Sequence, residues 1–253
     1  MDLGLRGKSV LITGGSKGIG LACAVSFAAE GCNLHLASRN MELLQAAKRI
    51  VREHSPVEVA LHAADLRNPD ALKELAAACS AVDILVNNAG DIPAGDIETI
   101  DEAKWRYAWE LKVFGYVNLT RAIFSSMKSR KSGVVINVIG MAAENPSFDY
   151  VCGATANAAL AAFTKALGKG SQQFGIRVMG VHPPATRTDR IVQVMQARAK
   201  LKYGDENRTD DLIKDGLFVP PIDPEQVADA VVYLASPRAS QLSGIMMNLG
   251  VVK

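Results

Sequence analysis

Apolar segments of strand length alternate with amphipathic segments of helix length along almost the whole chain. The strand-length segments are apolar at nearly every position, which is typical of parallel strands in a sheet covered on both faces. We expect strands over residues 9–13, 33–38, 57–63, 83–88, 133–139, 176–182 and 244–249. We expect helices to begin near Gly18, Met41, Asp70, Asp101, Ala154, Asp189 and Asp223. Because regular alternation implies right-handed crossovers between parallel strands, the pattern predicts an α/β protein.

The predicted fold is a single-domain, Rossmann-type, doubly wound sheet that is mainly parallel, has seven strands and carries helices on both faces. One domain is expected over residues 1–253, because no repeat or low-complexity tract divides the chain. The one irregular stretch, residues 202–225, is rich in charged residues, glycine and proline. It lies late in the chain, which favours a mobile substrate flap at about residues 189–222 over a linker between domains.

Composition narrows the possible classes of protein. Of the 253 residues, 49% are apolar and 21% are charged, which is the balance of a globular protein with a large core. A net charge of +2 gives no basic face for nucleic acid. No segment approaches the roughly 20 apolar residues of a membrane span, and the first apolar run is too short for a signal peptide. We therefore expect a cytoplasmic protein with no nucleic-acid or membrane partner.

The four cysteines are scattered along the chain and have no spacing typical of a zinc site or a redox motif. They are Cys23, Cys32, Cys79 and Cys152. We interpret them as small buried hydrophobic residues in a reducing compartment, and no metal site is predicted. Cys152 has an alternative role as a nucleophile because of its position, but no base is evident beside it.

The clearest chemical signal is the stretch TGGSKGIG, which follows the first strand and opens the first helix. In that context Gly14 permits a tight turn, Gly18 lets the backbone approach a pyrophosphate, and Gly20 allows close packing of helix on strand. The N-terminus of the helix adds N–H donors and positive potential. The stretch therefore predicts a phosphate-binding turn.

With these residues the chain resembles the short-chain dehydrogenase/reductase family over nearly its whole length. TGGSKGIG is similar to the family's T-G-x-x-x-G-x-G, NNAG at 87–90 to its next signature, and HPPATRT at 182–188 to its P-G-x-x-x-T stretch. The resemblance implies that residues 65–66 border the adenine of a dinucleotide, that residues 88–90 line its ribose side, and that Thr188 holds the carboxamide. The predicted cofactor-binding residues are Gly14, Ser16, Lys17, Gly18, Ile19, Gly20, Arg39, Asp65, Leu66, Asn88, Ala89, Gly90 and Thr188.

The charge at the end of the second strand indicates which nicotinamide cofactor binds. An acid there would bind ribose hydroxyls and repel a 2′-phosphate, but this chain has Ser38 followed by Arg39. Lys17 adds a second cation within the glycine turn, and two such groups suit a phosphate. The sequence therefore favours NADP(H) over NAD(H). The alternative is that Arg39 stacks on the adenine and Lys17 points to solvent.

The resemblance also implies positions for four catalytic side chains. Family members reduce carbonyls with a serine, a Tyr-x-x-x-Lys pair and a helix asparagine. Counted back from AAFTKAL, the position of the tyrosine holds Gly153 and that of the lysine holds Asn157. The position of the serine holds Gly140, and that of the asparagine holds Lys112. Because all four are replaced, we expect an atypical member that lacks the usual Asn-Ser-Tyr-Lys set.

Two other side chains are candidates for proton transfer. Tyr150 lies three residues before the position of the tyrosine, but Ala154 stands where its lysine partner would be. Its alternative role is to pack or to line a pocket. Burial in a dry cleft would lower the pKa of Lys112, so that it acts as an acid, a base or an imine-forming amine. Alternatively, Lys112 fills the empty volume by pairing with a carboxylate or by capping carbonyls. His182 is interpreted as structural.

Three functions stay open at this point. The first is an NADP(H)-dependent oxidoreductase with non-standard proton transfer, whose substrate carries a hydride acceptor such as an activated alkene or an iminium-like carbon. The second is a catalytically inert cofactor-binding regulator or partner subunit. The third is a non-redox lyase or isomerase on the same scaffold, because fold alone does not fix chemistry. The resemblance also implies a homo-oligomer, either a tetramer or a dimer, and the small-molecule substrate is not identified.

Overall fold

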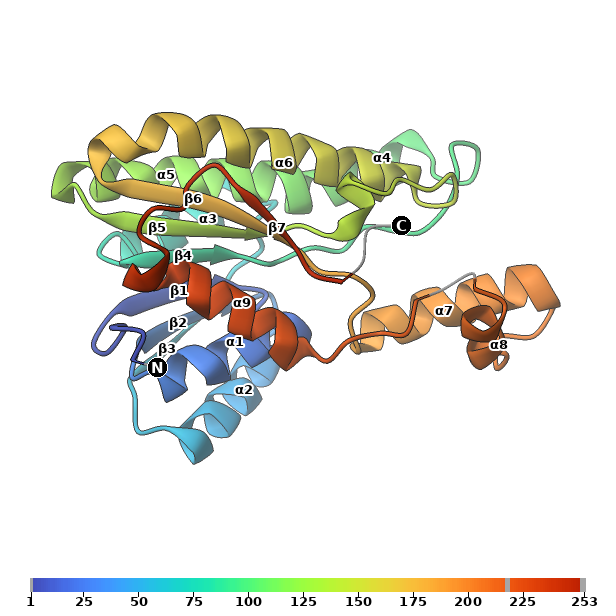
Figure 1. The fold of residues 1–253 in the computed structure, drawn as a ribbon, viewed down its shortest axis with the longest axis horizontal. Coiled ribbons are helices and arrows are strands. Elements are labelled where there is room, and N and C mark those ends of the chain that lie inside the picture. Colours follow the sequence, from blue (N-terminus) through green and yellow to red (C-terminus); the bar gives the residue numbers. More distant parts are fainter. Residues whose placement is uncertain (1, 217–218, 251–253) are drawn as a thin grey trace.

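Figure 1 shows the computed structural model, which describes residues 2–216 and 219–250. In this part of the chain, one parallel sheet of seven strands has the order β3-β2-β1-β4-β5-β6-β7. The strands are β1 (Ser9–Thr13), β2 (Asn33–Ser38), β3 (Val59–Ala63), β4 (Ile84–Asn87), β5 (Gly133–Val138), β6 (Ile176–His182) and β7 (Met246–Asn248). The strand order reverses between β1 and β4, which is the point where doubly wound sheets bind ligands. The predicted Rossmann-type fold is confirmed.

Helices cover both faces of the sheet (Figure 1). One face carries α1 (Gly18–Ala29), α2 (Met41–His54) and α9 (Pro224–Ala235). The other carries α3 (Pro69–Ala78), α4 (Glu102–Trp109), α5 (Gly115–Arg130) and α6 (Val151–Ser171). Beyond the carboxyl ends of the strands project α7 (Asp189–Tyr203) and α8 (Thr209–Lys214). Short 3₁₀ turns span Met141–Ala143, Gln172–Phe174 and Pro237–Ala239.

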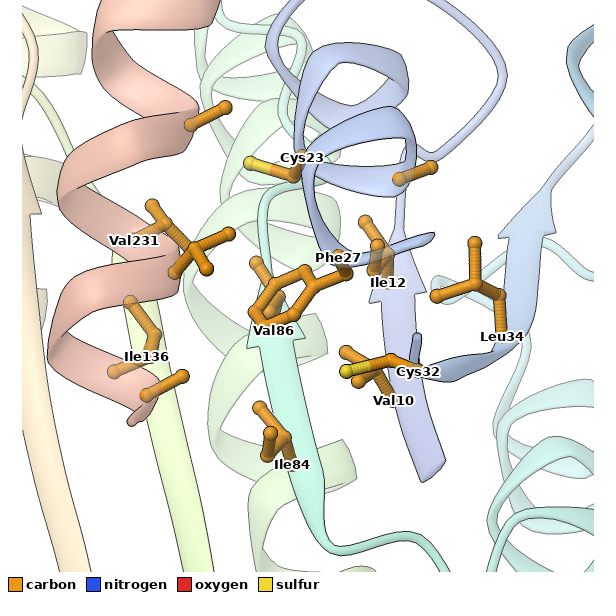
Figure 2. Close-up of a cluster of buried hydrophobic side chains, with 14 of the residues drawn as sticks. Val10, Ile12, Cys23, Phe27, Cys32, Leu34, Ile84, Val86, Ile136 and Val231 are labelled. Carbon is orange, nitrogen blue, oxygen red and sulfur yellow. The ribbon is translucent and has the colours of Figure 1, made fainter. Parts of the chain in front are cut away.

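Each face of the sheet has its own hydrophobic core, because successive strand side chains point to opposite faces. Figure 2 shows part of the first core, in which Phe27 of α1 lies among Ile12, Val86 and Val231. The second core packs α3 and α5 against the opposite face of the strands. All four cysteines are buried and free, as the sequence predicts.

Two segments differ from expectation. The helix expected from Asp101 is interrupted by a π-helical turn at Glu110–Phe114, which separates α4 from α5. A π-helical turn inserts only one extra residue into a helix, and the spacing of apolar residues in the sequence does not reveal so small a change. The stretch expected to be irregular contains α8, whose Leu212 forms a small core with residues of α7. That local core explains why charged and glycine-rich sequence is helical there.

The segment that contains α7 and α8 leaves the sheet and returns to it at neighbouring positions. The Arg187 N–H donates to the Ile222 carbonyl at 2.8 Å, and the Ile222 N–H donates to the Ala185 carbonyl at 2.9 Å. An ion pair of 2.7 Å between Arg187 and Asp223 lies beside these bonds. Both ends are thus fixed to each other, while the expected mobility of this segment stays a prediction.

Candidate functional site

The glycine turn joins the end of β1 to the start of α1. Gly14 and Gly18 have φ values of +65° and +55°, a left-handed conformation that side chains rarely adopt. A Cβ on Gly20 would lie 2.1 Å from the Gly14 carbonyl oxygen, so the helix and the turn are in direct contact. The residue before α1, Lys17, gives its first turn no side-chain cap. The N–H groups of this turn therefore fit an anionic group such as a pyrophosphate.

The segment after β4 holds the glycine turn in place. The Thr13 hydroxyl accepts hydrogen bonds from the N–H groups of Asn88 at 2.9 Å and Ala89 at 3.1 Å. The side-chain amide of Asn88 donates to the carbonyls of Thr13 at 3.1 Å and Gly14 at 3.4 Å. Polar groups at the ends of neighbouring strands thus fix the loop that the sequence assigns to the ribose side.

A chain of buried amides and hydroxyls continues across the sheet. Asn87 donates to the Thr120 hydroxyl at 3.0 Å and to the Asn137 side chain at 2.9 Å. Asn137 in turn donates to the Thr164 hydroxyl at 2.8 Å, which donates to the Leu160 carbonyl at 2.7 Å. These bonds connect β4, β5, α5 and α6, so they set where both helices lie relative to the strand ends. Asn137 is not among the residues predicted from the sequence to form the site.

The charged residues assigned to the nucleotide have different surroundings. Lys17 pairs with Asp189 of α7 at 3.5 Å, and both side chains are exposed. Arg39 is exposed immediately after β2. Burial raises the pKa of Asp65, but hydrogen bonds from Arg67, with a smaller contribution from Arg39, outweigh it and lower the pKa overall. The Asp65 carboxylate is therefore ionised and bound by Arg67 at 2.8 Å.

Several of the predicted cofactor-binding residues lie within the glycine turn or near it. Ser16 and Ile19 are half-buried within the turn, and Leu66 is buried. Thr188 lies against the turn, because a Cβ on Gly18 would be 3.1 Å from the Thr188 methyl group. The Thr188 hydroxyl caps the first turn of α7. The phosphate end of the predicted site is therefore adjacent to the start of α7.

Lys112 lies in the π-helical turn and is buried, with 8% of its surface exposed. Its ammonium donates to the carbonyls of Val138 at 2.9 Å and Ile139 at 3.2 Å, and to the Tyr116 hydroxyl at 3.3 Å. Burial, with help from Arg190, lowers the pKa of Lys112 to about 7. The three acceptors match its three hydrogens, so Lys112 caps carbonyls, one of the two structural alternatives that the sequence leaves open.

The ring of Tyr150 covers Gly153, the position that the resemblance assigns to the family's tyrosine. A Cβ on Gly153 would lie 2.1 Å from the Tyr150 ring and 2.6 Å from its hydroxyl. The hydroxyl accepts a hydrogen bond of 3.2 Å from Arg190 of α7. Arg190 also donates to the Ile92 carbonyl and pairs with Asp91 at 3.5 Å. A phenol and a cation therefore meet here, although neither belongs to a Tyr-x-x-x-Lys pair.

The positions that the resemblance assigns to the serine and the lysine contact each other. Gly140 has a φ of +132°, and a Cβ placed on it would lie 3.0 Å from the Asn157 side-chain nitrogen. His182 donates from Nδ1 to the Gly140 carbonyl at 2.6 Å. Burial lowers the pKa of His182, so the imidazole is neutral and its role is to hold this turn. The structure thus groups Gly140, Asn157 and His182 at the carboxyl ends of β5 and β6.

The strand order and the glycine turn define a doubly wound α/β protein with a Rossmann-type turn. Residues 8–199 match the family model of the short chain dehydrogenases, and the chain belongs to that family. It is 31% identical to 2,3-dihydro-2,3-dihydroxybenzoate dehydrogenase of Bacillus subtilis (strain 168), over 97% of this chain and 95% of that protein. The family is one of oxidoreductases.

Two solved structures extend the comparison. L-Sorbose reductase from Gluconobacter frateurii, complexed with NADPH and L-sorbose, has a TM-score of 0.89 and 31% identity, covering 98% of this chain and 97% of that chain. A 7 alpha-hydroxysteroid dehydrogenase complexed with NADH and 7-oxo glycochenodeoxycholic acid has a TM-score of 0.84 and 26% identity, covering 98% and 94%. Relatives of this chain therefore include both NADPH and NADH complexes.

The hydrogen-bond partner of Tyr150 could not be predicted from the sequence. Arg190 is 40 positions from Tyr150, and no local spacing connects them. Only the order of the strands brings α7 beside the start of α6.

Within residues 2–216 and 219–250, no helix has the length and apolar character to cross a membrane. The cytoplasmic location, the homo-oligomer and the small-molecule substrate stay predictions.

Proposed function

We propose that this chain is an atypical NADP(H)-dependent oxidoreductase in which Tyr150, held by Arg190, supplies the proton. The observation that supports this proposal most is that the Tyr150 ring fills the space next to Gly153, with its hydroxyl 2.6 Å from the position of the missing Cβ. The usual serine, lysine and asparagine are replaced by Gly140, Asn157 and Lys112. Proton transfer must therefore use other groups than in ordinary members.

A bound nicotinamide would donate or accept a hydride. When a hydride reaches a carbonyl or imine carbon, negative charge develops on the heteroatom, and a proton donor must lie within hydrogen-bond reach. The Tyr150 oxygen accepts a bond from Arg190, and no hydrogen bond recorded among the described residues uses the tyrosine's own hydrogen. The guanidinium keeps its charge and would stabilise the phenolate that remains after proton donation.

Lys112 acts as a positioning residue in this proposal. Its ammonium holds the carbonyls of Val138 and Ile139, which lead directly into Gly140. Its side chain also lies against Gly90, where a Cβ would be 2.8 Å from the lysine Cδ. With all three hydrogens matched by acceptors, Lys112 has less freedom than Tyr150 to transfer a proton.

The two other functions are supported less well. An inert cofactor-binding regulator or partner subunit would explain why the usual catalytic set is replaced. A lyase or isomerase would also use this site without net oxidation. The relatives described above are named as dehydrogenases and a reductase, which favours redox chemistry for this chain. An activated alkene or an iminium-like carbon remains the proposed hydride acceptor. Hydride addition to the alkene leaves an enolate that Tyr150 would protonate, whereas the iminium-like carbon gives a neutral amine without a proton donor.

We expect the purified protein to oxidise NADPH with at least one member of a panel of aldehydes, ketones, imines and enones. With that substrate, Tyr150→Phe should lower kcat by about 10²–10⁴-fold and leave NADPH affinity unchanged, because only the proton donor is lost. Tyr233→Phe is the matched control, since Tyr233 is 39% exposed on α9. Silence against the whole panel would contradict the proposed activity, and an unchanged rate for Tyr150→Phe would contradict the role of Tyr150.

Cofactor preference provides a separate test at Arg39. Arg39→Glu should raise the Kd for NADPH by about 10–100-fold, because a charge-assisted bond to the 2′-phosphate is lost. Affinity for NADH should be retained or improved, since an acid at this position binds ribose hydroxyls. Fluorescence titration measures both constants. Arg49→Glu, an exposed site on α2, makes the same charge change as a control. Equal weakening of both cofactors would contradict the NADP(H) assignment.

A further inference from the structure

Two histidines and a cysteine meet under the outer edge of the sheet. His35 lies in β2, His62 in β3, and Cys79 directly follows α3. His35 alternates with Leu34 and Leu36, which belong to the other core, so its side chain points to the face that α3 covers. Cys79 belongs to the core on that same face. The three side chains therefore converge from three separate elements.

The three donor atoms lie close together. The distance from His35 Nδ1 to His62 Nε2 is 3.0 Å. Cys79 Sγ lies 3.5 Å from His35 Nδ1 and 3.7 Å from His62 Nε2. The hydrogen bonds recorded for these side-chain atoms are to one another. No charged side chain takes part in those bonds.

These distances can be compared with the geometry of a metal site. Tetrahedral zinc with Zn–N bonds of about 2.0–2.1 Å and Zn–S bonds of about 2.3 Å separates two nitrogens by about 3.4 Å. The same geometry separates nitrogen from sulfur by about 3.6 Å. The sulfur distances agree with these values to about 0.1 Å, and the two nitrogens need to move apart by only a few tenths of an ångström. The arrangement thus matches one triangular face of a tetrahedron.

We propose that His35, His62 and Cys79 form a binding site for Zn²⁺, with a water molecule as the fourth ligand. Imidazole and thiolate are the ligands that Zn²⁺ uses most, and three protein ligands leave one open position. Burial raises the pKa of the Cys79 thiol to about 12, so coordination releases one proton from the metal-free protein. No sequence spacing reveals the site, because its ligands come from β2, β3 and the end of α3.

Helices of a doubly wound sheet run back toward the amino ends of the strands, so Cys79 at the end of α3 approaches the cluster from that side. His62 is the second-last residue of β3, three residues before Asp65, which the resemblance assigns to the adenine side. A metal at Cys79 would connect β2 and β3 to α3. Because the unfolded chain does not hold these ligands together, binding should stabilise the folded state.

Protein treated with a chelator and then titrated with Co²⁺ or Zn²⁺ tests the proposal without any measurement of activity. We expect one Co²⁺ per chain, with the visible absorption of tetrahedral cobalt and a thiolate-to-cobalt charge-transfer band. Saturation with Zn²⁺ at about 100 times the Kd should raise Tm by about 5–10 °C. Either the absence of a bound metal or an unchanged Tm would show that the cluster is only a hydrogen-bonded group of neutral side chains.

Variants locate the bound metal. Cys79→Ala should remove the charge-transfer band and weaken metal binding by about 100-fold or more, and His62→Gln should weaken it similarly. Cys23→Ala is the matched control, because it removes another buried free thiol from a different element, α1. Cobalt binding that survives both Cys79→Ala and His62→Gln would place the metal elsewhere and overturn the proposal. NADPH affinity should be the same in the unmodified protein, Cys79→Ala and Cys23→Ala.

Discussion

Gly20→Ala is expected to weaken dinucleotide binding strongly. Its Cβ would lie 2.1 Å from the Gly14 carbonyl oxygen and 2.7 Å from the Asn88 side-chain nitrogen. The first of these atoms is backbone in a turn whose Thr13 and Asn88 bonds fix it, so the turn must open to accept the methyl group. The N–H groups that would bind the phosphates then no longer converge. We expect the Kd for NADPH to rise by about 100-fold or more, measured by fluorescence titration.

Gly170→Ala provides the matched control for this substitution. Gly170 is exposed near the end of α6, and a Cβ there meets no atom within 4 Å. The same change should stabilise the protein by about 1 kcal/mol, because alanine has the higher helix propensity, and should leave NADPH affinity unchanged. If Gly20→Ala binds NADPH as tightly as the unmodified protein, the glycine turn is not the phosphate site.

The sequence predicts the sheet well because its signals are local. Strands such as Ser9–Thr13 and Ile176–His182 are mainly apolar and lie between loop residues, and their limits agree with the prediction to the residue. The shortest strand, Met246–Asn248, lies at an edge and was predicted too long. The π-helical turn around Lys112 and helix α8 were missed, because one depends on a single extra residue and the other on a small core with α7.

The local features of the candidate site could likewise be predicted from the sequence, and its long-range contacts could not. The glycine turn could be predicted because its residues are consecutive and their conformations are set within the turn itself. The partners of Tyr150 and Lys112 could not be predicted, because Arg190 and the Val138 carbonyl are 40 and 26 positions away. Such contacts depend on how α6, α7 and β5 are arranged in three dimensions. The same limit applies to the cluster of His35, His62 and Cys79, whose members are 27 and 17 positions apart.

Lys112 should make the stability of the protein depend on pH in an unusual direction. Burial lowers its pKa from an ordinary 10.5 to about 7 in the folded protein. Above about pH 7 the folded protein therefore loses this proton, while the unfolded chain keeps it until about pH 10.5. Because the unfolded state binds more protons in this window, stability rises with pH, by about 1.4 kcal/mol per pH unit at most. Below the window, the full cost of burying the ammonium is present.

Lys112→Met removes the titrating group and keeps an apolar side chain of similar length, so the comparison isolates this effect. The difference in free energy of unfolding between the unmodified protein and Lys112→Met should shift by about 2 kcal/mol in favour of the unmodified protein between about pH 7 and about pH 9. Urea unfolding at both pH values measures it, and other titrating groups cancel in the difference. A constant difference would mean that the carbonyls of Val138 and Ile139 hold Lys112 as an ammonium throughout, because those acceptors favour the charged form. The same experiment therefore decides whether this buried lysine is a neutral amine or a fixed cation between about pH 7 and about pH 9.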